Sequence, residues 1–394
     1  MKKIVDTFQA LTKLQKILVL IILTTVLYGG SSSLSYSVFS NLTMSSPTGK
    51  DTATVSLPGP TTALDEDANE PKTEECPLNG NKHSKKAKDL WTKRRPLAVM
   101  IENHTESRPQ SGLTTADVIY EAVAEGGITR FMALYYCNLK DVQVGPVRSA
   151  RTYYLNWLGE YDALYAHVGG ANTPGPADAL GQIIKYEVKD LNQFSIGFPV
   201  FWRDYQRLGH SVATEHTMYS TTQKLWEVGA KRGWTATDSA GIKWDKTFVP
   251  WKFKEDKAGG NTSKITVNFW DSQPSYQVEW NYDSTSNTYK RKNGGSDHLD
   301  LNNNQQLVAK NIVVQFEKES NANDGYPGNV HLLYGTTGSG KALIFMDGKA
   351  VEGKWNKQSR TARTKYVDAN GKEVEFNRGP IWIQTVPEGS KVNY

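Results

Sequence analysis

The segment Gly145–Arg151 (GPVRSAR) contains the residues of this sequence that are best suited to bind an anion. Arg148 and Arg151 stand three positions apart, directly after a Gly-Pro turn, and the residues that follow are typical of a helix. Guanidinium groups bind carboxylates and phosphates through paired N–H donors, and the free amides at a helix start can add to them. With Ser149 as the predicted helix cap, the pattern predicts an anion site at this point of the chain.

Two more arginines could contribute to the same site. Arg108 lies in SRPQSG, and Arg130 follows the turn at Gly126-Gly127. The alternative is that all four arginines are structural and pair with acidic residues to hold loops together. The candidate partners are Glu102, Glu121, Glu125, Asp117 and Glu160. Binding sites and ion-pair networks look alike in a sequence, so both interpretations stay open.

A hydrolase would need acid and base groups, and the sequence offers a few. Glu121 and Glu125 lie near the glycine-rich turn, while His167 and His216 occur in turn-rich segments. Two carboxylates at the right separation would allow glycan cleavage, but spacing in the sequence does not establish that separation. No GxSxG elbow is present, and Cys137 lies inside a strand-like run, so a nucleophilic mechanism is not indicated.

Neither a metal nor a nucleotide is predicted as a cofactor. His104, His167 and His216 have separations that impose no convergence, unlike the HExxH spacing, so no metal site is expected. Gly335–Lys341 (GTTGSGK) has the spacing of a phosphate loop. However, Ala342 follows the lysine and the chain continues as the strand-like ALIFM, which favours a glycine-rich hairpin.

The N-terminal region predicts attachment to a membrane. Lysines precede the apolar run Ile17–Tyr28, and no charge follows until Lys50. Residues 1–39 are therefore expected to form a cytoplasmic tip and a single transmembrane helix, with a cleaved signal peptide as the alternative. The positive flank places the folded part on the extracytoplasmic side of the cell membrane. Residues 40–90 are poor in large apolar side chains and are expected to be a disordered linker.

Two observations on composition bear on partners and redox state. The chain has 394 residues and a net charge of +5, which is too weak and diffuse to indicate nucleic-acid binding. Cys76 and Cys137 are the two cysteines. In an exported protein they could form a bridge between the linker and the first domain, whereas unpaired thiols are the alternative, and no spacing rule decides between them.

The remaining sequence predicts an α+β protein of two domains. In residues 91–245, the strand-like runs Pro96–Ile101, Asp117–Ala124 and Ala163–Val168 alternate with helical segments, which indicates a mixed α/β-layered domain. In residues 246–394, short alternating runs separated by Asn-Gly and Asp-Gly turns indicate a smaller, largely antiparallel β-rich domain.

Several ordered motifs resemble the YerB-like lipoprotein family, catalogued as a domain of unknown function. RPLAVMIENH, RPQSGL, ADVIYEAVAEGGITRF, GPVRSAR and HVGGA resemble its N-terminal domain, and KNIVVQF, GSGKALIFMDGKAVEGKW and GPIWIQTVP resemble its C-terminal domain. The resemblance implies an α+β domain followed by a β-rich domain on the outer face of the membrane. It implies no activity. This chain lacks a cysteine after its apolar run, so it departs from the lipid-anchored members.

Three functions are expected, in descending order of support. The first is a membrane-tethered envelope protein that binds an anionic ligand, such as a cell-wall fragment, through Arg148, Arg151, Arg130 and Arg108. The second is a scaffold that recruits proteins through the β domain. The third is a cell-wall hydrolase that uses Glu121 or Glu125 with His167 or His216.

Overall fold

The computed structural model describes Thr12, Leu14, Gln15 and residues 70–394. The predicted membrane segment at residues 17–39 lies outside these described residues, as does the linker as far as residue 69. Among the residues that are described, no helix has the length and apolar character needed to cross a membrane. We call residues 70–245 the N-terminal half and residues 246–394 the C-terminal half.

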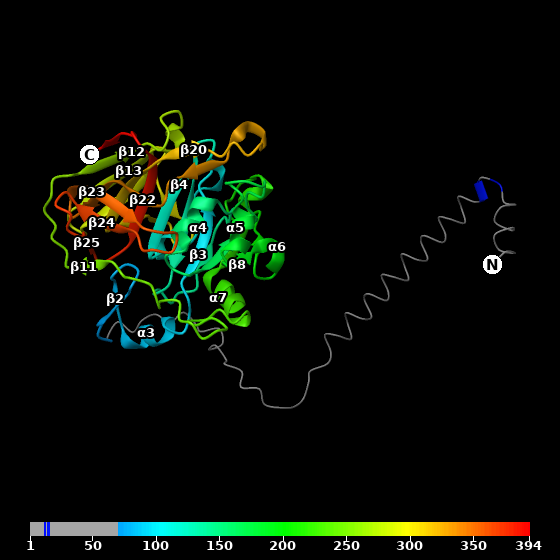
Figure 1. The fold of residues 1–394 in the computed structure, drawn as a ribbon, viewed down its shortest axis with the longest axis horizontal. Coiled ribbons are helices and arrows are strands. Elements are labelled where there is room, and N and C mark those ends of the chain that lie inside the picture. The colour runs from blue at the N-terminus through cyan, green and yellow to red at the C-terminus, as the bar shows by residue number, and fades with distance from the viewer. Residues whose placement is uncertain (1–11, 13, 16–69) are drawn as a thin grey trace, which may run out of the picture. The chain divides into compact units, whose positions relative to one another are not determined.

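A ten-stranded mixed sheet runs through both halves of the chain (Figure 1). Its C-terminal part comprises, in spatial order, β24 (Lys365–Asp368), β23 (Lys349–Lys357), β22 (Gly338–Met346), β19 (Asn311–Glu317) and β26 (Ile381–Pro387). Its N-terminal part continues with β4 (Val118–Glu125), β5 (Ile128–Tyr135), β3 (Leu97–Glu102), β7 (Leu164–His167) and β8 (Lys189–Asn192). The two parts join where β26 pairs in parallel with β4.

The predicted fold class, with an α/β-layered N-terminal domain, is therefore wrong. Strand predominates in the described residues, and the sheet is continuous across the two halves. The reason is visible in β4 and β26, whose residues are almost all buried. Strands that are apolar on both faces are stable in the middle of a covered sheet and not at its edge. Each half therefore places a largely buried strand against the other half.

The helices are short and belong to the N-terminal half. They are α3 (Lys85–Trp91), α4 (Thr152–Leu158), α5 (Ala179–Lys185), α6 (Gln193–Ile196) and α7 (Thr222–Lys231). Helix α7 is one of the helical segments expected within residues 91–245. Its first turn is capped by the Thr221 side chain, which accepts a hydrogen bond from the Lys224 amide. Leu225 and Trp226 are buried on its inner side, and the helix contacts β3, β7 and β8.

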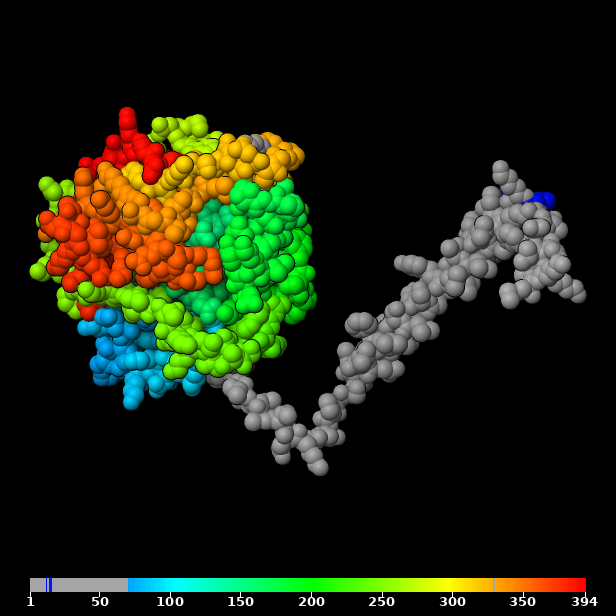
Figure 2. Space-filling model, in the orientation of Figure 1, coloured from blue at the N-terminus to red at the C-terminus, as the bar shows by residue number. Residues whose placement is uncertain are grey.

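A second, antiparallel sheet covers part of the first. It contains β15 (Ser296–Asp297), β14 (Thr288–Asn293), β13 (Val278–Asp283), β12 (Lys264–Val267) and β27 (Val392–Asn393), with β18 (Val308–Ala309) also paired to β14. Trp280 of β13 packs edge-on against Trp382 of β26, with ring centroids 5.2 Å apart. In the space-filling view, the green N-terminal segments and the orange C-terminal segments adjoin on the visible face (Figure 2).

The remaining elements are short strands and single 3₁₀ turns. The strands are β1 (Glu74–Glu75), β2 (Lys82–His83), β6 (Gln143–Val144), β9 (Trp202–Arg203), β10 (Met218–Thr221), β11 (Lys252–Lys254), β16 (Leu299–Asp300), β17 (Gln305–Gln306), β20 (Glu319–Asn321), β21 (Leu332–Tyr334) and β25 (Glu375–Asn377). The turns are η1 (Thr105–Ser107), η2 (Leu113–Thr115), η3 (Thr214–His216), η4 (Pro274–Tyr276) and η5 (Pro327–Asn329).

The last part of the predicted linker is ordered, which corrects the expectation for residues 70–90. Strands β1 and β2 and helix α3 lie in it, and Cys76 and Leu78 are completely buried. Cys76 forms a disulfide with Cys137, which settles the pairing that the sequence left open. The polar composition of this segment indicated disorder because its own apolar surface is small, but the covalent bond and the neighbouring core hold it in place.

The free energy of unfolding is expected to depend on pH because of the carboxyl group of Glu317, at the end of β19. This side chain is fully buried, and its Oε2 atom has no hydrogen-bond partner among the described residues. Burial raises the pKa of Glu317 from 4.5 to about 8. Between these values the native state binds more protons than the unfolded state, so the free energy of unfolding should fall as the pH rises. Urea denaturation at pH 5 and pH 8.5 measures this loss.

The Glu317→Gln variant provides the control, because an amide occupies a similar volume and does not titrate. Its free energy of unfolding should change less between the two pH values than that of the wild-type protein. An equal change in both proteins would show that other groups cause the pH dependence.

Candidate functional site

The GPVRSAR segment lies beside the sheet in an extended conformation. The Arg148 amide donates to Met100 O at 2.9 Å, and the Ala150 amide donates to Gly169 O at 2.9 Å. These bonds hold residues 148–150 against β3 and the turn after β7. Helix α4 therefore begins later than predicted, with Arg151 at the N-cap position and no side-chain cap. The predicted cap at Ser149 is wrong, because the helix comprises Thr152–Leu158.

Arg130 and Arg151 converge on one carboxylate. Arg151 Nη2 lies 2.6 Å from Glu125 Oε1, and Arg130 Nη2 lies 3.2 Å from the same atom. Both arginines are almost entirely buried. Burial alone raises the pKa of Glu125, but the two guanidinium groups outweigh this effect and hold it at about 2. Two positive charges thus share one negative charge, and the structural pairing considered for these arginines is present.

Arg148 is more open than its two neighbours. Its Nε atom donates to Glu102 Oε1 at 3.0 Å, and a quarter of its side chain is exposed. The other oxygen of Glu102 accepts a hydrogen bond from His216 Nδ1 at 2.8 Å. This hydrogen bond raises the pKa of His216. Glu102 therefore links the arginine to a histidine on the distant turn η3.

Arg108 belongs to a different environment. It donates to Asn103 Oδ1 at 3.1 Å and to Ser275 O at 3.0 Å, and its guanidinium lies over the Tyr276 ring. It therefore connects the loop after β3 to the C-terminal half.

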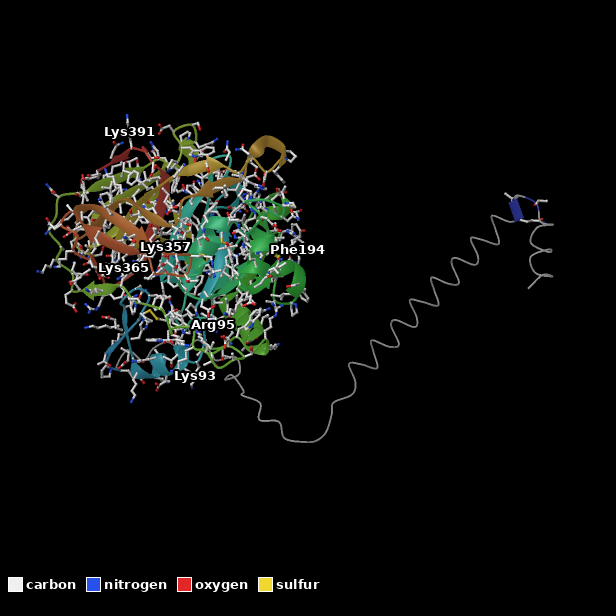
Figure 3. All side chains as sticks on the ribbon, viewed as in Figure 1. Lys93, Arg95, Phe194, Lys357, Lys365 and Lys391 are labelled. Carbon is white, nitrogen blue, oxygen red and sulfur yellow. A yellow bond between two sulfur atoms is a disulfide. The ribbon has the colours of Figure 1, made fainter. Side chains whose placement is uncertain are left out.

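A cavity of about 520 Å³ opens next to Arg148. Arg148 is the one residue among the four predicted arginines that lines it. The other lining residues are Val147, Ser149, Val168, Gly169, Gly170, Asn172, Leu180, Phe194, Arg203, Glu215 and Met218. We call this cavity the arginine pocket. It combines two guanidinium groups with one carboxylate, and the exposed ring of Phe194 on α6 forms part of its lining (Figure 3).

Arg203 is a residue of the pocket that was not predicted from the sequence. It donates hydrogen bonds to Thr214 O and Thr217 Oγ1, and both acceptors are neutral. It lies in β9, a two-residue strand that is separated from helix α6 by five residues. A charged residue at such a position is ordinary in a sequence, and the pairing of β9 with β10 is what brings it to the pocket.

The candidate catalytic carboxylates are held in ion pairs. Glu121 is completely buried, and its oxygens accept hydrogen bonds from Arg291 at 2.9 Å, Trp382 at 2.9 Å and Thr129 at 3.0 Å. Glu125 is engaged by Arg130 and Arg151, as described above. Glu121 is out of reach of a substrate in this arrangement, so the structure offers no support for the hydrolase hypothesis at that residue.

Of the three histidines considered as metal ligands, one lies in the core and the other two lie together. His167 is fully buried, and its nitrogens lie 2.7 Å from Gly169 O and 2.7 Å from Asp190 Oδ1, so it is a satisfied core residue. His104 and His216 instead lie together, with nearly parallel rings whose centroids are 4.7 Å apart. The sequence did not predict this convergence, because 112 positions separate the two residues.

A second cavity, of about 310 Å³, lies elsewhere and is less suitable for an anion. Lys189 and Arg360 contribute to its lining. Lys189 pairs with Asp162 at 2.6 Å, and Arg360 lies over the Tyr186 ring. The glycine-rich segment Gly335–Lys341 is likewise no phosphate site, because β22 begins at Gly338 and the segment continues as a strand, which confirms the predicted hairpin.

Comparison with known proteins identifies the family of this chain. Residues 80–235 match the N-terminal domain of "Protein of unknown function (DUF3048)", and residues 265–383 match its C-terminal domain. The chain belongs to the DUF3048 family. The two DUF3048 domains correspond to the two halves described above, which share the ten-stranded sheet.

A relative and a solved structure extend this result. The DUF3048 chain is 30% identical over 318 residues to "Putative lipoprotein YerB" of Bacillus subtilis (strain 168), covering 79% of this chain and 86% of the relative. It is also similar to the crystal structure of YerB protein from Bacillus subtilis, with a TM-score of 0.68 and 27% sequence identity. That match covers 82% of this chain and 100% of the crystallised chain.

Proposed function

We propose that this DUF3048 protein is a membrane-associated protein of the cell envelope that binds an anionic ligand in the arginine pocket. Two observations support the location. The relative YerB is described as a lipoprotein, and Cys76 and Cys137 form a disulfide, a bond that persists in oxidising extracytoplasmic compartments. The predicted N-terminal helix would tether the protein to the cell membrane.

The charged side chains of the arginine pocket support the proposal that its ligand is an anion. Arg148 and Arg203 line a cavity of about 520 Å³, and the acceptors of Arg203 are neutral, so its positive charge is available to a ligand. Arg130 donates to the carbonyl of Ser149, which lines the pocket, and Arg130 and Arg151 together with Glu125 carry one net positive charge. Charge-assisted hydrogen bonds from guanidinium groups favour carboxylates and phosphates.

Glu215 narrows the class of ligand. Its carboxylate lines the same pocket as the two arginines and would repel a simple polyanion. A ligand with both carboxylate and ammonium groups can satisfy both kinds of side chain. Peptide fragments of the cell wall have this combination of charges, and Phe194 supplies an apolar surface for their aliphatic parts. Peptides of the cell wall are therefore the class of ligand that fits the arginine pocket best.

Calorimetry of the full-length protein with purified muropeptides tests this proposal. The Arg148→Ala and Arg203→Ala variants should each weaken binding by about 10- to 100-fold, which is the usual effect of losing a hydrogen bond to a charged group. Arg378→Ala is a matched control, because Arg378 pairs with Glu75 and Glu255 away from the pocket. Binding that is absent, or equally weakened by all three substitutions, would contradict the proposal.

A scaffold function is the second candidate, and three exposed apolar side chains favour it. Ile184, Phe194 and Phe198 are each at least three-quarters exposed and lie within fifteen residues of one another. Exposed apolar side chains that occur close together often mark sites of protein contact. A Phe198→Ser variant should lose crosslinked envelope proteins if this surface recruits them, while ligand binding in the arginine pocket should persist.

A further inference from the structure

The turns η1 and η3 bring three metal-binding side chains together outside the arginine pocket. His104 precedes η1, Glu106 lies within it, and His216 ends η3. One candidate ligand atom from each of the three lies within 4.8 Å of the others. The connection is made by tertiary structure alone, since η3 lies more than one hundred residues beyond η1.

His216 is oriented in the way that metal-binding histidines usually are. Its Nδ1 donates to Glu102 Oε2 at 2.8 Å, which leaves Nε2 as the nitrogen that can bind a metal ion. Nε2 lies 3.6 Å from Glu106 Oε2. Histidine ligands commonly donate their second nitrogen to a carboxylate, which fixes the tautomer and makes the imidazole a stronger ligand. Glu102 is itself held by Arg148 and is buried, so the orientation of His216 is fixed before any ion binds.

His104 and Glu106 form the adaptable side of the cluster. The Glu106 side chain is 56% exposed, and His104 is partly buried in a surface turn. His104 Nδ1 accepts a long hydrogen bond of 3.2 Å from the Glu106 amide. A shared ion must lie in the plane of each imidazole, so the His104 ring has to turn out of its stack on His216 when the ion binds. A short surface turn permits this rotation.

We propose that His104, Glu106 and His216 form a binding site for Zn²⁺ or a similar divalent transition-metal ion, with Glu102 as the positioning residue for His216. Two imidazoles and one carboxylate suit zinc, whereas Mg²⁺ and Ca²⁺ prefer oxygen ligands. Tetrahedral ligands at zinc distances are about 3.3 Å apart, which is close to the 3.6 Å between His216 and Glu106. With three protein ligands, the fourth position is left to solvent or to a ligand.

The other metal-like cluster does not compete with this site. Cys76, Asp117 and Cys137 also lie within ligand distance of one another, but the two sulfur atoms are joined in the disulfide and offer no thiolate. None of the three proposed zinc ligands lines the arginine pocket, and the two sites are linked through Glu102, which pairs with Arg148 of the pocket.

The test is a calorimetric titration with Zn²⁺. The full-length, tag-free protein is first treated with a chelator to remove bound metal. One equivalent of Zn²⁺ should bind, and Mg²⁺ should not compete. The His216→Ala and His104→Ala variants should each bind at least about 100-fold more weakly, and Glu102→Gln about 10- to 100-fold more weakly, as expected for loss of a partner of a histidine ligand. Glu106→Ala, at an exposed position, should weaken binding without affecting folding.

His331→Ala is the matched control for nonspecific binding to histidine. His331 Nδ1 also pairs with a carboxylate, Asp324, at 2.8 Å, but it does not belong to the proposed cluster. This variant should bind one equivalent of Zn²⁺ with unchanged affinity. Titration with Co²⁺ should add the visible absorption of a tetrahedral complex in the wild-type protein and not in Glu106→Ala. Zinc binding that persists in a His104→Ala/His216→Ala protein, or that is absent in the wild type, would overturn the proposal.

Discussion

The Glu121→Ala variant should lose about 3–5 kcal/mol of its free energy of unfolding, because it leaves Arg291 buried without a counter-charge. Both side chains are completely buried, and Glu121 of β4 and Arg291 of β14 come from the two different halves of the chain. The substitution also removes the acceptor for the Trp382 indole. Urea denaturation followed by tryptophan fluorescence measures the loss.

Two further variants separate the ionic contribution from the loss of volume. Glu121→Gln keeps the size of the side chain and an acceptor oxygen but leaves Arg291 unpaired, so it should still be strongly destabilised. A Glu121→Met/Arg291→Met protein removes both charges and should recover much of the lost stability, since apolar replacements of a buried pair are often tolerated. If the stability losses of the Glu121→Met and Arg291→Met single variants add up to the loss of the double variant, the two side chains are not energetically coupled.

The stability of the Glu121 variants would also decide whether Glu121 is a structural or a catalytic carboxylate. A catalytic carboxylate can be removed with little effect on stability, whereas a buried carboxylate that joins two halves cannot. A second pairing of the same kind supports the structural interpretation. Glu160, just after α4, accepts from Lys357 at 2.8 Å and from Arg363 at 3.0 Å, and both partners lie in the C-terminal half. In Figure 3, Lys357 lies within the body of the molecule.

Local features of the fold could be predicted from the sequence. The run Pro96–Ile101 predicted a strand that the structure places at Leu97–Glu102, and the run Ala163–Val168 predicted the strand Leu164–His167. Both predictions depend on side-chain periodicity within a few turns or residues. The parallel pairing of β26 with β4 could not be predicted, because β-pairing between residues so far apart leaves no local pattern. For this reason the α/β-layered fold predicted for the N-terminal part was wrong.

The candidate site shows the same limit. The sequence singled out GPVRSAR as a candidate anion site, and the structure places Arg148 in the lining of a cavity. The predicted cap at Ser149 failed because Ala150 is held in a β-bridge to Gly170, which keeps the chain extended for longer. The sequence of β14 contains one signal of a buried ion pair that was not used in the prediction. Tyr289, Arg291 and Asn293 alternate along β14 and are all buried, and an arginine at an inward position of a strand indicates a buried acidic partner.

Loss of the disulfide is expected to have an effect as large as loss of the Glu121 pair. The bond joins cysteines 61 positions apart, and the chain-entropy model gives a stabilisation of about 4 kcal/mol for a loop of this length. A Cys76→Ala/Cys137→Ala protein should therefore unfold at a much lower urea concentration than the oxidised wild type. Alanine is the appropriate replacement because both cysteines are completely buried, and a serine hydroxyl would need a hydrogen-bond partner there.

Reduction of the wild-type protein provides the matched control for this variant. With dithiothreitol in the denaturation series, the wild-type curve should move to that of the double-alanine protein, whose own curve should not change. The residues most affected should be those around Cys76, because β1, β2 and α3 are the elements that the bond attaches to β5 and the turn after it. Asp117 also contacts this region, through Asn79 at 2.9 Å and the Tyr136 amide at 2.7 Å. If the double-alanine protein loses less than about 1 kcal/mol, these polar contacts and the buried Leu78 and Trp91 hold the segment without the covalent bond, and the entropic account of the disulfide is wrong for this protein.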